Sequence, residues 1–287
     1  MTISGFSFIR NGILFDYPFI ESIRSILPLC DEFVVAVGKS EDQTLSAIRS
    51  LDDSRIKIVE TIWDDVLRTG GTILAQQTDI ALERTSGDWA FYLQGDEVVH
   101  EEDLPAIREG MKKYLDIQAV EGLLFKFMHF YGSYRHIGNS RKWYRREIRI
   151  VRNKIGVKSW RDAQGFRIAG RKMRVKPVEA SVYHYGWVKP PRIQHQKQLR
   201  FNKLWHTDSW ITKHVQQGPQ FDYSSGGVLS EFTGNHPAVM KQRIATSSWS
   251  FSYNPDEARH SVKDQILGWI EQKTGYRIGE YKNYVLV

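Results

Sequence analysis

The first 115 residues alternate between short apolar runs typical of buried strands and stretches with the periodicity of amphipathic helices. Strands that alternate with helices through short connections predict an α/β fold with right-handed crossovers and a mixed, mainly parallel sheet flanked by helices. We expect strands at residues 6–10, 32–37, 55–60 and 88–93, and helices at 18–27, 44–51, 73–85 and 104–115.

The second half of the chain changes character at the Pro190-Pro191 pair. Further β-prone stretches precede this pair, whereas two helix candidates and a Gly/Ser/Asn-rich loop follow it. Because a Pro-Pro pair does not fit inside a helix, we expect a core domain at 1–190 and a mostly helical or irregular extension at 191–287, packed on the core. The expected strands are 122–131, 147–152 and 174–185, the helices 194–205 and 262–273, and the loop 216–236.

The single cysteine, Cys30, excludes an internal disulfide and a cysteine-cluster zinc site. Its apolar neighbours Leu27 and Leu29 favour a buried structural thiol over a nucleophile. No apolar run approaches the roughly 20 residues that cross a bilayer, and the N-terminus lacks the basic and apolar regions of a secretory signal. We therefore expect a cytoplasmic protein, either free or peripheral to the inner face of the membrane.

The formal charge of +7 comes from basic residues that concentrate between positions 135 and 176. A basic face of this kind can serve nucleic acid, an anionic membrane surface or phosphorylated small molecules, and it can also be a solvated surface. Aromatic residues interleave with the basic ones, but no signature of a nucleic-acid-binding module is present. We predict no nucleic-acid partner and keep peripheral membrane contact open.

The acidic stretch 88–103 combines the end of a buried strand with several carboxylates. An apolar strand ends at Leu93, and Gly95 then breaks the run before the adjacent carboxylates Asp96 and Glu97. Ligands of open α/β sheets bind beyond the carboxyl ends of the strands, and two carboxylates there suit a hard cation that bridges to substrate phosphates. The alternative is a solvated acidic turn in which residues 101–103 favour a helix N-terminus. The residues alone leave both interpretations open.

An ordered set of motifs makes the chain resemble family-2-like glycosyltransferases of the GT-A fold. The set consists of Phe8-Ile-Arg-Asn11, the loop 38–44, Gly70-Gly71 with Gln76-Gln77, and the stretch 87–97. The resemblance covers about residues 3–190 and is strongest over 3–105. It implies transfer of a sugar from a nucleotide-sugar donor, with a UDP-sugar as the first expectation.

The resemblance also implies a donor site. The end of the first strand and the acidic loop after the second would hold the base and ribose, which points to Phe8, Arg10 and Asp42, with Glu41 as a further candidate. The resemblance also points to Gln77 as part of the same nucleotide-sugar site. A carboxylate can accept hydrogen bonds from a uracil-like imide or a ribose hydroxyl. Asp42 could instead cap the following helix.

The Asp-x-Asp motif of the family falls on Gln94-Gly95-Asp96, so Gln94 replaces the first aspartate. The resemblance implies that Asp96, Glu97 and His184 hold a divalent cation, Mn²⁺ or Mg²⁺, with Gln94 beside the donor. Such an ion would act as a Lewis acid on the departing nucleoside diphosphate. The replacement by Gln94 leaves open a weak or lost metal dependence, and a lone histidine is more often structural.

For an inverting transfer, a general base must deprotonate the acceptor hydroxyl, and Asp162 is the candidate. Its rivals are an ion pair with Arg161 or Arg167 and the acids Glu101 and Glu102. Further candidates are aromatic residues that could stack on sugars and arginines that could neutralise donor phosphates: Trp143, Tyr144, Trp160, Arg149 and Arg152.

The leading expectation is a glycosyltransferase that acts on a glycan or a lipid-linked acceptor in cell-surface polysaccharide biosynthesis. A nucleotidyltransferase is the alternative enzyme, because it also combines an α/β nucleotide domain with a carboxylate-bound metal. The third alternative is a non-catalytic protein that binds nucleotide sugars or glycans, since the first aspartate of the motif is missing.

Overall fold

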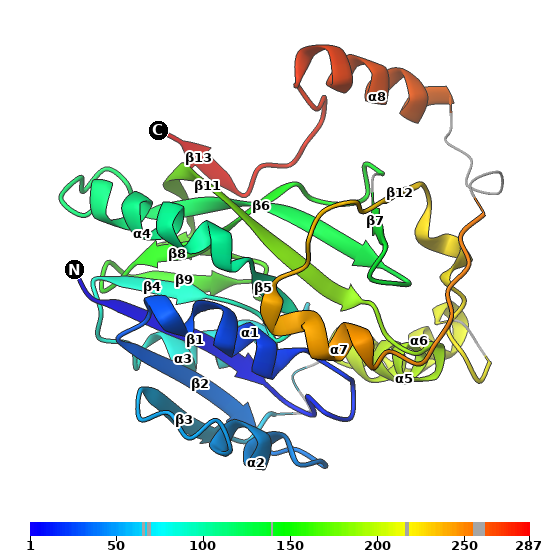
Figure 1. Ribbon diagram of the computed structural model, residues 1–287, viewed down its shortest axis with the longest axis horizontal. Helices are drawn as coiled ribbons and strands as arrows, with labels where there is room; N and C mark the ends of the chain where they lie inside the picture. The colour runs from blue at the N-terminus through cyan, green and yellow to red at the C-terminus, as the bar shows by residue number, and fades with distance from the viewer. Residues whose placement is uncertain (65–66, 68–69, 139, 216–217, 255–261) are drawn as a thin grey trace.

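The computed structural model describes residues 1–64, 67, 70–138, 140–215, 218–254 and 262–287. Four parallel strands build one half of its central sheet in the order β3-β2-β1-β4. They are β1 (Ile3–Ile9), β2 (Glu32–Gly38), β3 (Ile56–Thr61) and β4 (Trp89–Tyr92). All four lie where the sequence predicts strands. Their carboxyl ends meet at one edge of the sheet (Figure 1).

Helices cover both faces of this half-sheet. They are α1 (Phe19–Ile26), α2 (Thr44–Arg49), α3 (Thr72–Leu82) and α4 (Leu104–Lys113). Along β2, Phe33 and Val35 pack in a core shared with α1, α2 and α4, whereas Val34 and Ala36 pack in a core shared with α3. Because successive side chains of a strand point to opposite faces, burial on both sides requires the continuous apolar run that β2 has.

The other half of the sheet contains antiparallel neighbours. Strand β8 runs antiparallel to both β4 and β6, while β11 runs parallel to β6 and carries the short strand β5 antiparallel beside it. The mixed α/β sheet flanked by helices is thus as predicted, although only its N-terminal half is parallel throughout. The bounds are β5 (Glu97–Val99), β6 (Gly122–Tyr131), β8 (Arg146–Arg152) and β11 (Arg171–Trp187).

Smaller strands extend the edges of the sheet. Strands β9 and β10 form a hairpin beside β11, β7 and β12 pair with each other, and β13 adds to β11. They are β7 (His136–Gly138), β9 (Val157–Trp160), β10 (Gly165–Ile168), β12 (Leu229–Glu231) and β13 (Tyr284–Leu286). β12 lies inside the predicted loop 216–236, so that prediction was wrong at this point.

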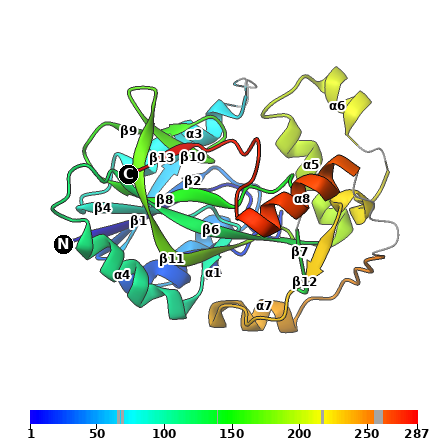
Figure 2. The ribbon, with the colours of Figure 1, turned by 90° about the horizontal axis from the view of Figure 1, so that it is seen from above.

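The C-terminal extension contributes α5 (Pro191–Asn202), α6 (Asp208–His214), α7 (Lys241–Ala245) and α8 (Val262–Thr274). Pro191 occupies the first turn of α5, where the missing N–H costs no hydrogen bond. Figures 1 and 2 place α5 and α6 at the end of the molecule toward which β1 runs. The boundary at 190 remains a prediction, but α5 follows it directly and packs at the strand ends.

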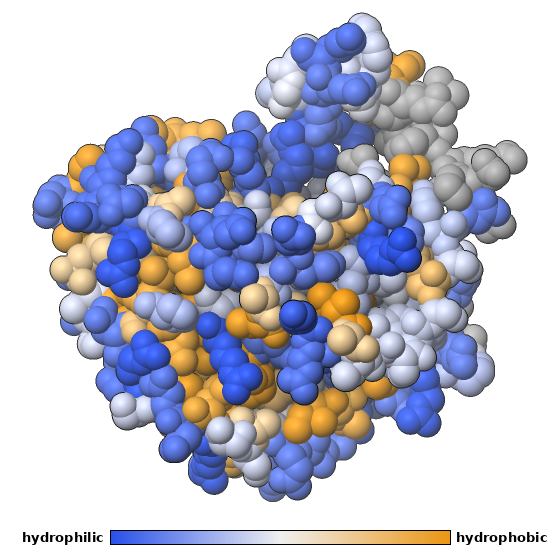
Figure 3. All heavy atoms as spheres, viewed as in Figure 1, coloured by the Kyte–Doolittle hydropathy of each residue, from blue (hydrophilic) through white to orange (hydrophobic). Residues whose placement is uncertain are grey.

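Cys30 is buried, and its Sγ atom donates to the carbonyl of Ile26 at 3.1 Å. Burial raises the pKa of this thiol to about 12, so it stays protonated at neutral pH, as expected for a structural thiol. No helix in the described part of the chain is long and apolar enough to cross a membrane. On the face in Figure 3, hydrophilic side chains surround scattered apolar ones, and α8 projects at the upper edge.

Candidate active site

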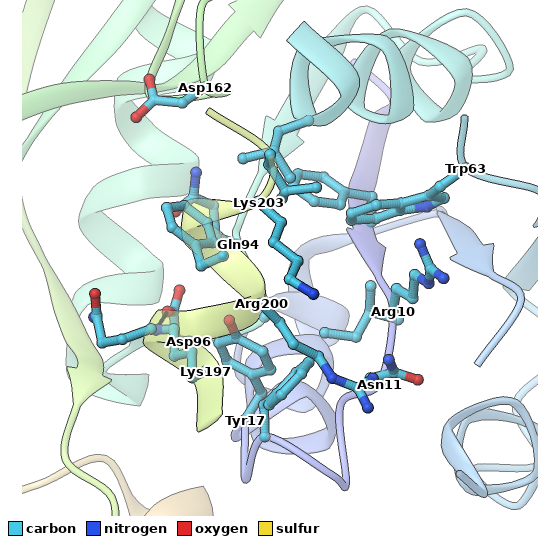
Figure 4. Close-up of a pocket in the computed structure, with 18 of the residues that line it drawn as sticks. Arg10, Asn11, Tyr17, Trp63, Gln94, Asp96, Asp162, Lys197, Arg200 and Lys203 are labelled. Carbon is cyan, nitrogen blue, oxygen red and sulfur yellow. Dashed lines mark ion pairs between the residues drawn. The ribbon is translucent and has the colours of Figure 1, made fainter. Parts of the chain in front are cut away.

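A cavity of about 650 Å³ opens at the carboxyl ends of β1 and β4. Strand ends form its floor, the loop before β5 and the end of β11 form one side, and α5 closes it from the extension (Figure 4). Its volume is that of a pocket for a cofactor-sized ligand. The lining includes Phe8, Arg10, Asn11, Tyr17, Glu41, Trp63, Gln94, Asp96, Tyr144, Asp162, Gln164, His184, Trp187, Lys197, Arg200 and Lys203.

Strand pairing brings Asp96 and His184 together. Glu97 is the first residue of β5 and pairs with His184 of β11, and the N–H of Tyr185 donates to the carbonyl of Asp96 at 2.8 Å. The Oδ2 atom of Asp96 consequently lies 3.7 Å from Nε2 of His184. The structure thus brings together two of the three residues that the resemblance implies as metal ligands.

Positive charge surrounds the Asp96 carboxylate. The ammonium group of Lys197 lies 3.5 Å from Oδ2 and donates to the carbonyl of Gly186 at 2.9 Å, and the buried Lys189 lies close by. Burial opposes ionisation of Asp96, but hydrogen bonding and charge from His184, with the charges of Lys197 and Lys189, outweigh it and hold its pKa well below the usual range. Asp96 is therefore a carboxylate throughout the neutral pH range.

A glycine keeps the space between Asp96 and His184 open. A Cβ atom at Gly186 would lie 2.6 Å from Nε2 of His184 and 2.7 Å from Oδ2 of Asp96. Any side chain here would fill the gap between the Asp96 carboxylate and the His184 ring. Among the described residues, no group of three or more His, Cys, Asp or Glu side chains could hold a metal ion unaided. Asp96 and His184 offer two protein ligands at most, so a cation held there would take its remaining ligands from phosphate and water, as Mg²⁺ commonly does.

Glu97 points away from this gap. Its carboxylate accepts hydrogen bonds from Nε and Nη2 of Arg149 at 2.8 and 2.6 Å, and both side chains are fully buried. The same carboxylate accepts the backbone N–H of Gln94 at 3.1 Å. Glu97 therefore stabilises the turn that carries Asp96 and does not line the cavity, in contrast to the metal-ligand role that the resemblance implies for it.

The two arginines considered for donor phosphates are committed elsewhere. Arg149 is bound to Glu97 and lies over the rings of Tyr92 and Phe127. Arg152 donates to backbone carbonyls that follow α4, and its guanidinium lies 4.6 Å from the centre of the Trp89 ring. Both are buried structural residues, which corrects the expectation for these two positions.

An aromatic and cationic wall lies opposite Asp96. The rings of Phe8 and Trp63 are 6.0 Å apart, and the Arg10 guanidinium carbon lies 5.4 Å from the Trp63 ring centre. Figure 4 shows Trp63, Arg10 and Asn11 on this side of the cavity. Phe8 and Arg10 thus line the cavity at the end of β1, and their role in binding a donor stays a prediction. Trp63 was not predicted, although its position directly after β3 places it at the same edge of the sheet.

Two residues implied for the donor site lie outside the cavity lining. Asp42 accepts hydrogen bonds from the N–H of Leu14 at 2.6 Å and from the N–H of Thr44 at 2.9 Å, and it also binds the Thr44 hydroxyl. It thereby fixes the start of α2, which is the alternative role considered for it. Gln77 is buried and accepts from the hydroxyl of Thr61 at 2.6 Å, which links α3 to β3.

The acidic loop nevertheless reaches the cavity through Glu41. Its carboxylate receives two hydrogen bonds from Arg200 of α5, at 2.6 and 3.0 Å. Together with Lys197 and Lys203, Arg200 presents cations at intervals of three residues, which places them on one side of the helical segment. The basic composition of 194–205 is visible in the sequence, but its packing against the cavity is not.

Asp162 lies on the opposite edge of the cavity from Arg10 and Asn11, beyond Gln94 (Figure 4). Burial raises its pKa above the usual aspartate value. The side-chain amide of Gln94 donates to the carbonyl of Ala163 at 3.1 Å, which ties the Asp162 loop to the turn of Asp96.

Two of the rivals of Asp162, Arg167 and Glu101, have other partners. Arg167 donates to the carbonyls of Phe166 and Asn283, both at 3.0 Å. Glu101 lies in a short 3-10 helix before α4 and accepts from the N–H of Ala238 at 3.0 Å. Of these acids, Asp162 is the one that lines the cavity.

No protein-family model and no curated protein matches the sequence. Solved structures with some similarity include those of TarS from S. aureus. Its residues 1–349 in complex with UDP-GlcNAc align with a TM-score of 0.35 at 20% identity, over 46% of this chain and 36% of that one. A second TarS structure has a TM-score of 0.40 at 16% identity, over 76% and 41%. The complex with UDP has a TM-score of 0.40 at 13% identity, over 76% and 68%.

The aligned part thus spans well under half of the first two TarS chains. The residues of the cavity, and not these similarities, carry the functional assignment.

Proposed function

We propose that this protein is a glycosyltransferase that moves a sugar from a nucleotide-sugar donor to a hydroxyl group of a glycan or lipid-linked acceptor. One observation carries the proposal. A single cavity at the strand ends joins an aromatic and cationic wall, the Asp96–His184 pair and the carboxylate of Asp162. These three groups suit, in this order, the nucleoside, the diphosphate and the reacting sugar of a nucleotide sugar.

The nucleoside would bind at the wall formed by Phe8, Arg10 and Trp63. Aromatic faces accept the planar base by stacking, and the Glu41 carboxylate beside them accepts hydrogen bonds from ribose or base N–H and O–H groups. A UDP-sugar is the first donor to consider.

The diphosphate would cross the cavity between α5 and Asp96. Asp96 with His184 would hold the divalent cation, Lys197 lies 3.5 Å from the same carboxylate, and Arg200 adds positive charge further along α5. Bound there, the cation would supply Lewis-acid stabilisation of the leaving diphosphate. Lys197 and Arg200 would also stabilise the negative charge of the leaving diphosphate, because they are held in place before that charge develops.

The sugar would then lie near Gln94 and Asp162. An acceptor hydroxyl attacks the anomeric carbon, its oxygen forms the new glycosidic bond, and Asp162 takes its proton. The bond between the anomeric carbon and the phosphate oxygen breaks, and the electron pair leaves with the nucleoside diphosphate. This single displacement inverts the anomeric configuration.

Two alternatives predict different products. A nucleotidyltransferase would release pyrophosphate after attack at the α-phosphate, near the nucleoside end of the cavity. The placement of Asp162 away from the Arg10 and Trp63 side favours reaction at the sugar end instead. A non-catalytic binding protein would form no product.

Thermal-shift screening of nucleotide sugars with and without Mn²⁺ tests the proposal. A ligand at 100 times its Kd stabilises the native state by about 2.7 kcal/mol, so a specific donor should raise the Tm clearly. We expect one nucleotide sugar to raise it, and Mn²⁺ to enhance the effect. Stabilisation by nucleoside triphosphates but by no nucleotide sugar would contradict the proposal and favour the nucleotidyltransferase.

A further inference from the structure

The C-terminal segment 266–287 exposes many apolar side chains. Ile266 and Trp269 lie three residues apart on α8 and therefore share a face of that helix, and Trp269 is 61% exposed. Figures 1 and 2 show α8 and the segment that follows it on the same side of the molecule. Most of the exposed large apolar residues in the described part of the chain belong to this segment: Ile266, Trp269, Tyr276, Ile278, Tyr281, Val285, Leu286 and Val287.

A small cavity with a basic lining lies within the same region. It has a volume of about 130 Å³ and is bordered by the residues after α8, by β13 and by the start of β8. Tyr276 and Leu286 line it, so the cavity is continuous with the apolar segment. Its charged lining residues are one acid, Glu280, and four cations, Arg145, Arg146, Arg277 and Lys282, among the residues that the structure describes.

The glutamates of this region are already paired with arginines. Glu280 accepts two hydrogen bonds from Arg145, at 2.8 and 2.7 Å. Glu271 of α8 forms ion pairs with Arg141, Arg145 and Arg277, at 3.1, 3.0 and 2.8 Å. These three arginines therefore compensate both carboxylates, and the remaining cations of the region have no acid there to neutralise them.

The remaining cations point outward. Arg146 and Lys282 are exposed, and neither side chain makes a hydrogen bond or an ion pair within the described part of the chain. The carboxylate of Glu179, which feels the charge of Arg146, is paired with Lys126 at 2.6 Å. Lys273 is also exposed and lies four residues after the aromatic side chain of α8, on the same face of the helix. Uncompensated positive charge thus borders the exposed apolar residues.

We propose that segment 266–287, together with Arg146, is a docking surface for an anionic phospholipid membrane. Its apolar side chains would enter the interfacial region of the bilayer, and its cations would meet the lipid phosphates. Tryptophan and tyrosine are enriched at that depth. The aliphatic residues Ile266, Ile278 and Leu286 favour lipid over single-stranded nucleic acid, because bases bind by stacking on aromatic rings.

The docking surface lies next to the Asp162 end of the active-site cavity. Arg146 is followed in β8 by the buried Glu147, whose Oε1 atom accepts a hydrogen bond from Nε2 of Gln164 at 2.9 Å. Gln164 lines the cavity together with Asp162. A docked membrane would therefore present a lipid-linked acceptor near the proposed base. This consequence, unlike the docking itself, rests on the proposed function.

Co-sedimentation with lipid vesicles tests the docking without donor, metal or acceptor. We expect the wild-type protein to bind vesicles of equal parts phosphatidylcholine and phosphatidylglycerol much more tightly than vesicles of phosphatidylcholine alone. Binding should weaken as salt is added, because salt screens the attraction between the cations and the lipid phosphates. Absence of binding to the anionic vesicles would overturn the proposal.

Two double variants locate the cationic part of the surface. Each basic residue near an anionic membrane contributes roughly a factor of five in affinity, so Arg146→Gln with Lys282→Gln should weaken vesicle binding by about 10–30-fold. Arg24→Gln with Lys112→Gln removes two exposed cations from α1 and α4 and is the matched control, which should bind nearly as the wild type does. Equal losses in the two double variants would overturn the assignment to this surface.

A single variant tests the apolar part. Trp269→Ala should weaken vesicle binding by about 10-fold, because it removes a large apolar side chain that enters the interface. Ile117→Ala, at another exposed apolar residue, is the control. Wild-type vesicle binding by Trp269→Ala would contradict a role of α8 in docking.

Other occupants of the surface give different results. A wild-type dimer that Trp269→Ala dissociates, without vesicle binding, would show that two copies pair through this surface and would overturn the proposal. Binding of a single-stranded oligonucleotide in place of vesicles would overturn it as well. Vesicle binding by a protein that no nucleotide sugar stabilises would support the docking surface and contradict only the proposed function.

Discussion

The Oδ2 atom of Asp96 lies 3.7 Å from Nε2 of His184, with no side chain on Gly186 to fill the space between them. Asp96 precedes β5 and His184 lies in β11, and the pairing of these antiparallel strands fixes their distance. The cation site proposed here is therefore a product of sheet register.

The gap at Gly186 should be sensitive to one added methyl group. Gly186 does not have a positive φ, so alanine is compatible with its backbone, but the new Cβ would crowd both ligand atoms. We expect Gly186→Ala to weaken Mn²⁺ binding by about 10–100-fold while the fold persists. Gly268→Ala, where a Cβ meets open space, is the matched control. Unchanged Mn²⁺ affinity in Gly186→Ala would show that the ion binds elsewhere.

Asp162 should act as the general base. Asp162→Asn is expected to lower kcat by about 10²–10⁴-fold and to leave donor affinity unchanged, with the exposed Asp116→Asn as control. Since the base works as a carboxylate and burial raises its pKa, the wild-type rate should fall as the pH drops through a value above that of an ordinary aspartate. Loss of donor affinity equal to the loss of kcat would assign Asp162 to binding instead.

The buried Glu97–Arg149 pair should matter for stability. Arg149→Met leaves an unpaired buried carboxylate, and we expect a loss of about 3–5 kcal/mol in the free energy of unfolding. The double variant with Glu97→Gln should recover much of this loss. Arg49→Met breaks the exposed pair with Glu60 and should cost at most about 1 kcal/mol. Urea denaturation measures all three, and a small effect of Arg149→Met would mean that water or another cation reaches Glu97.

Glu147 should make stability depend on pH. Burial raises its pKa from the ordinary 4.5 to about 7. The protonated carboxyl is favoured in the folded state, so its stabilisation is complete below pH 4.5 and is lost as the pH rises through 7. Glu147→Gln mimics the protonated form, and its stability relative to the wild type should grow by about 3 kcal/mol across this window. A stability difference that does not change with pH would contradict this.

The strand-end residues were predictable from sequence. Gln94, Asp96 and Arg10 follow or end apolar runs of parallel strands, and the carboxyl ends of such strands share one edge. The structural role of Glu97 was not predicted. Adjacent residues in an extended segment point in opposite directions. Its neighbour Asp96 faces the cavity, so Glu97 faces Arg149.

Residues outside the parallel strands escaped prediction for a different reason. Lys197 and Arg200 face the cavity only because α5 folds back onto the strand ends, and that packing is a tertiary contact with no local pattern. His129 lies in an aromatic β-prone segment whose partner, His184, is far away in the sequence. Sheet order, which places β6 beside β11, has to be known before the two histidines can be paired.

The most direct test identifies the nucleotide that the reaction releases. Wild-type protein and Asp96→Asn are incubated with the donor that stabilises the wild type, Mn²⁺ and glycan or lipid-linked acceptors, and the released nucleotide is identified. The proposed chemistry predicts acceptor-dependent release of nucleoside diphosphate, reduced by about 10²–10³-fold in Asp96→Asn and unchanged in the exposed Glu60→Gln. Release of pyrophosphate, or full activity of Asp96→Asn, would contradict it.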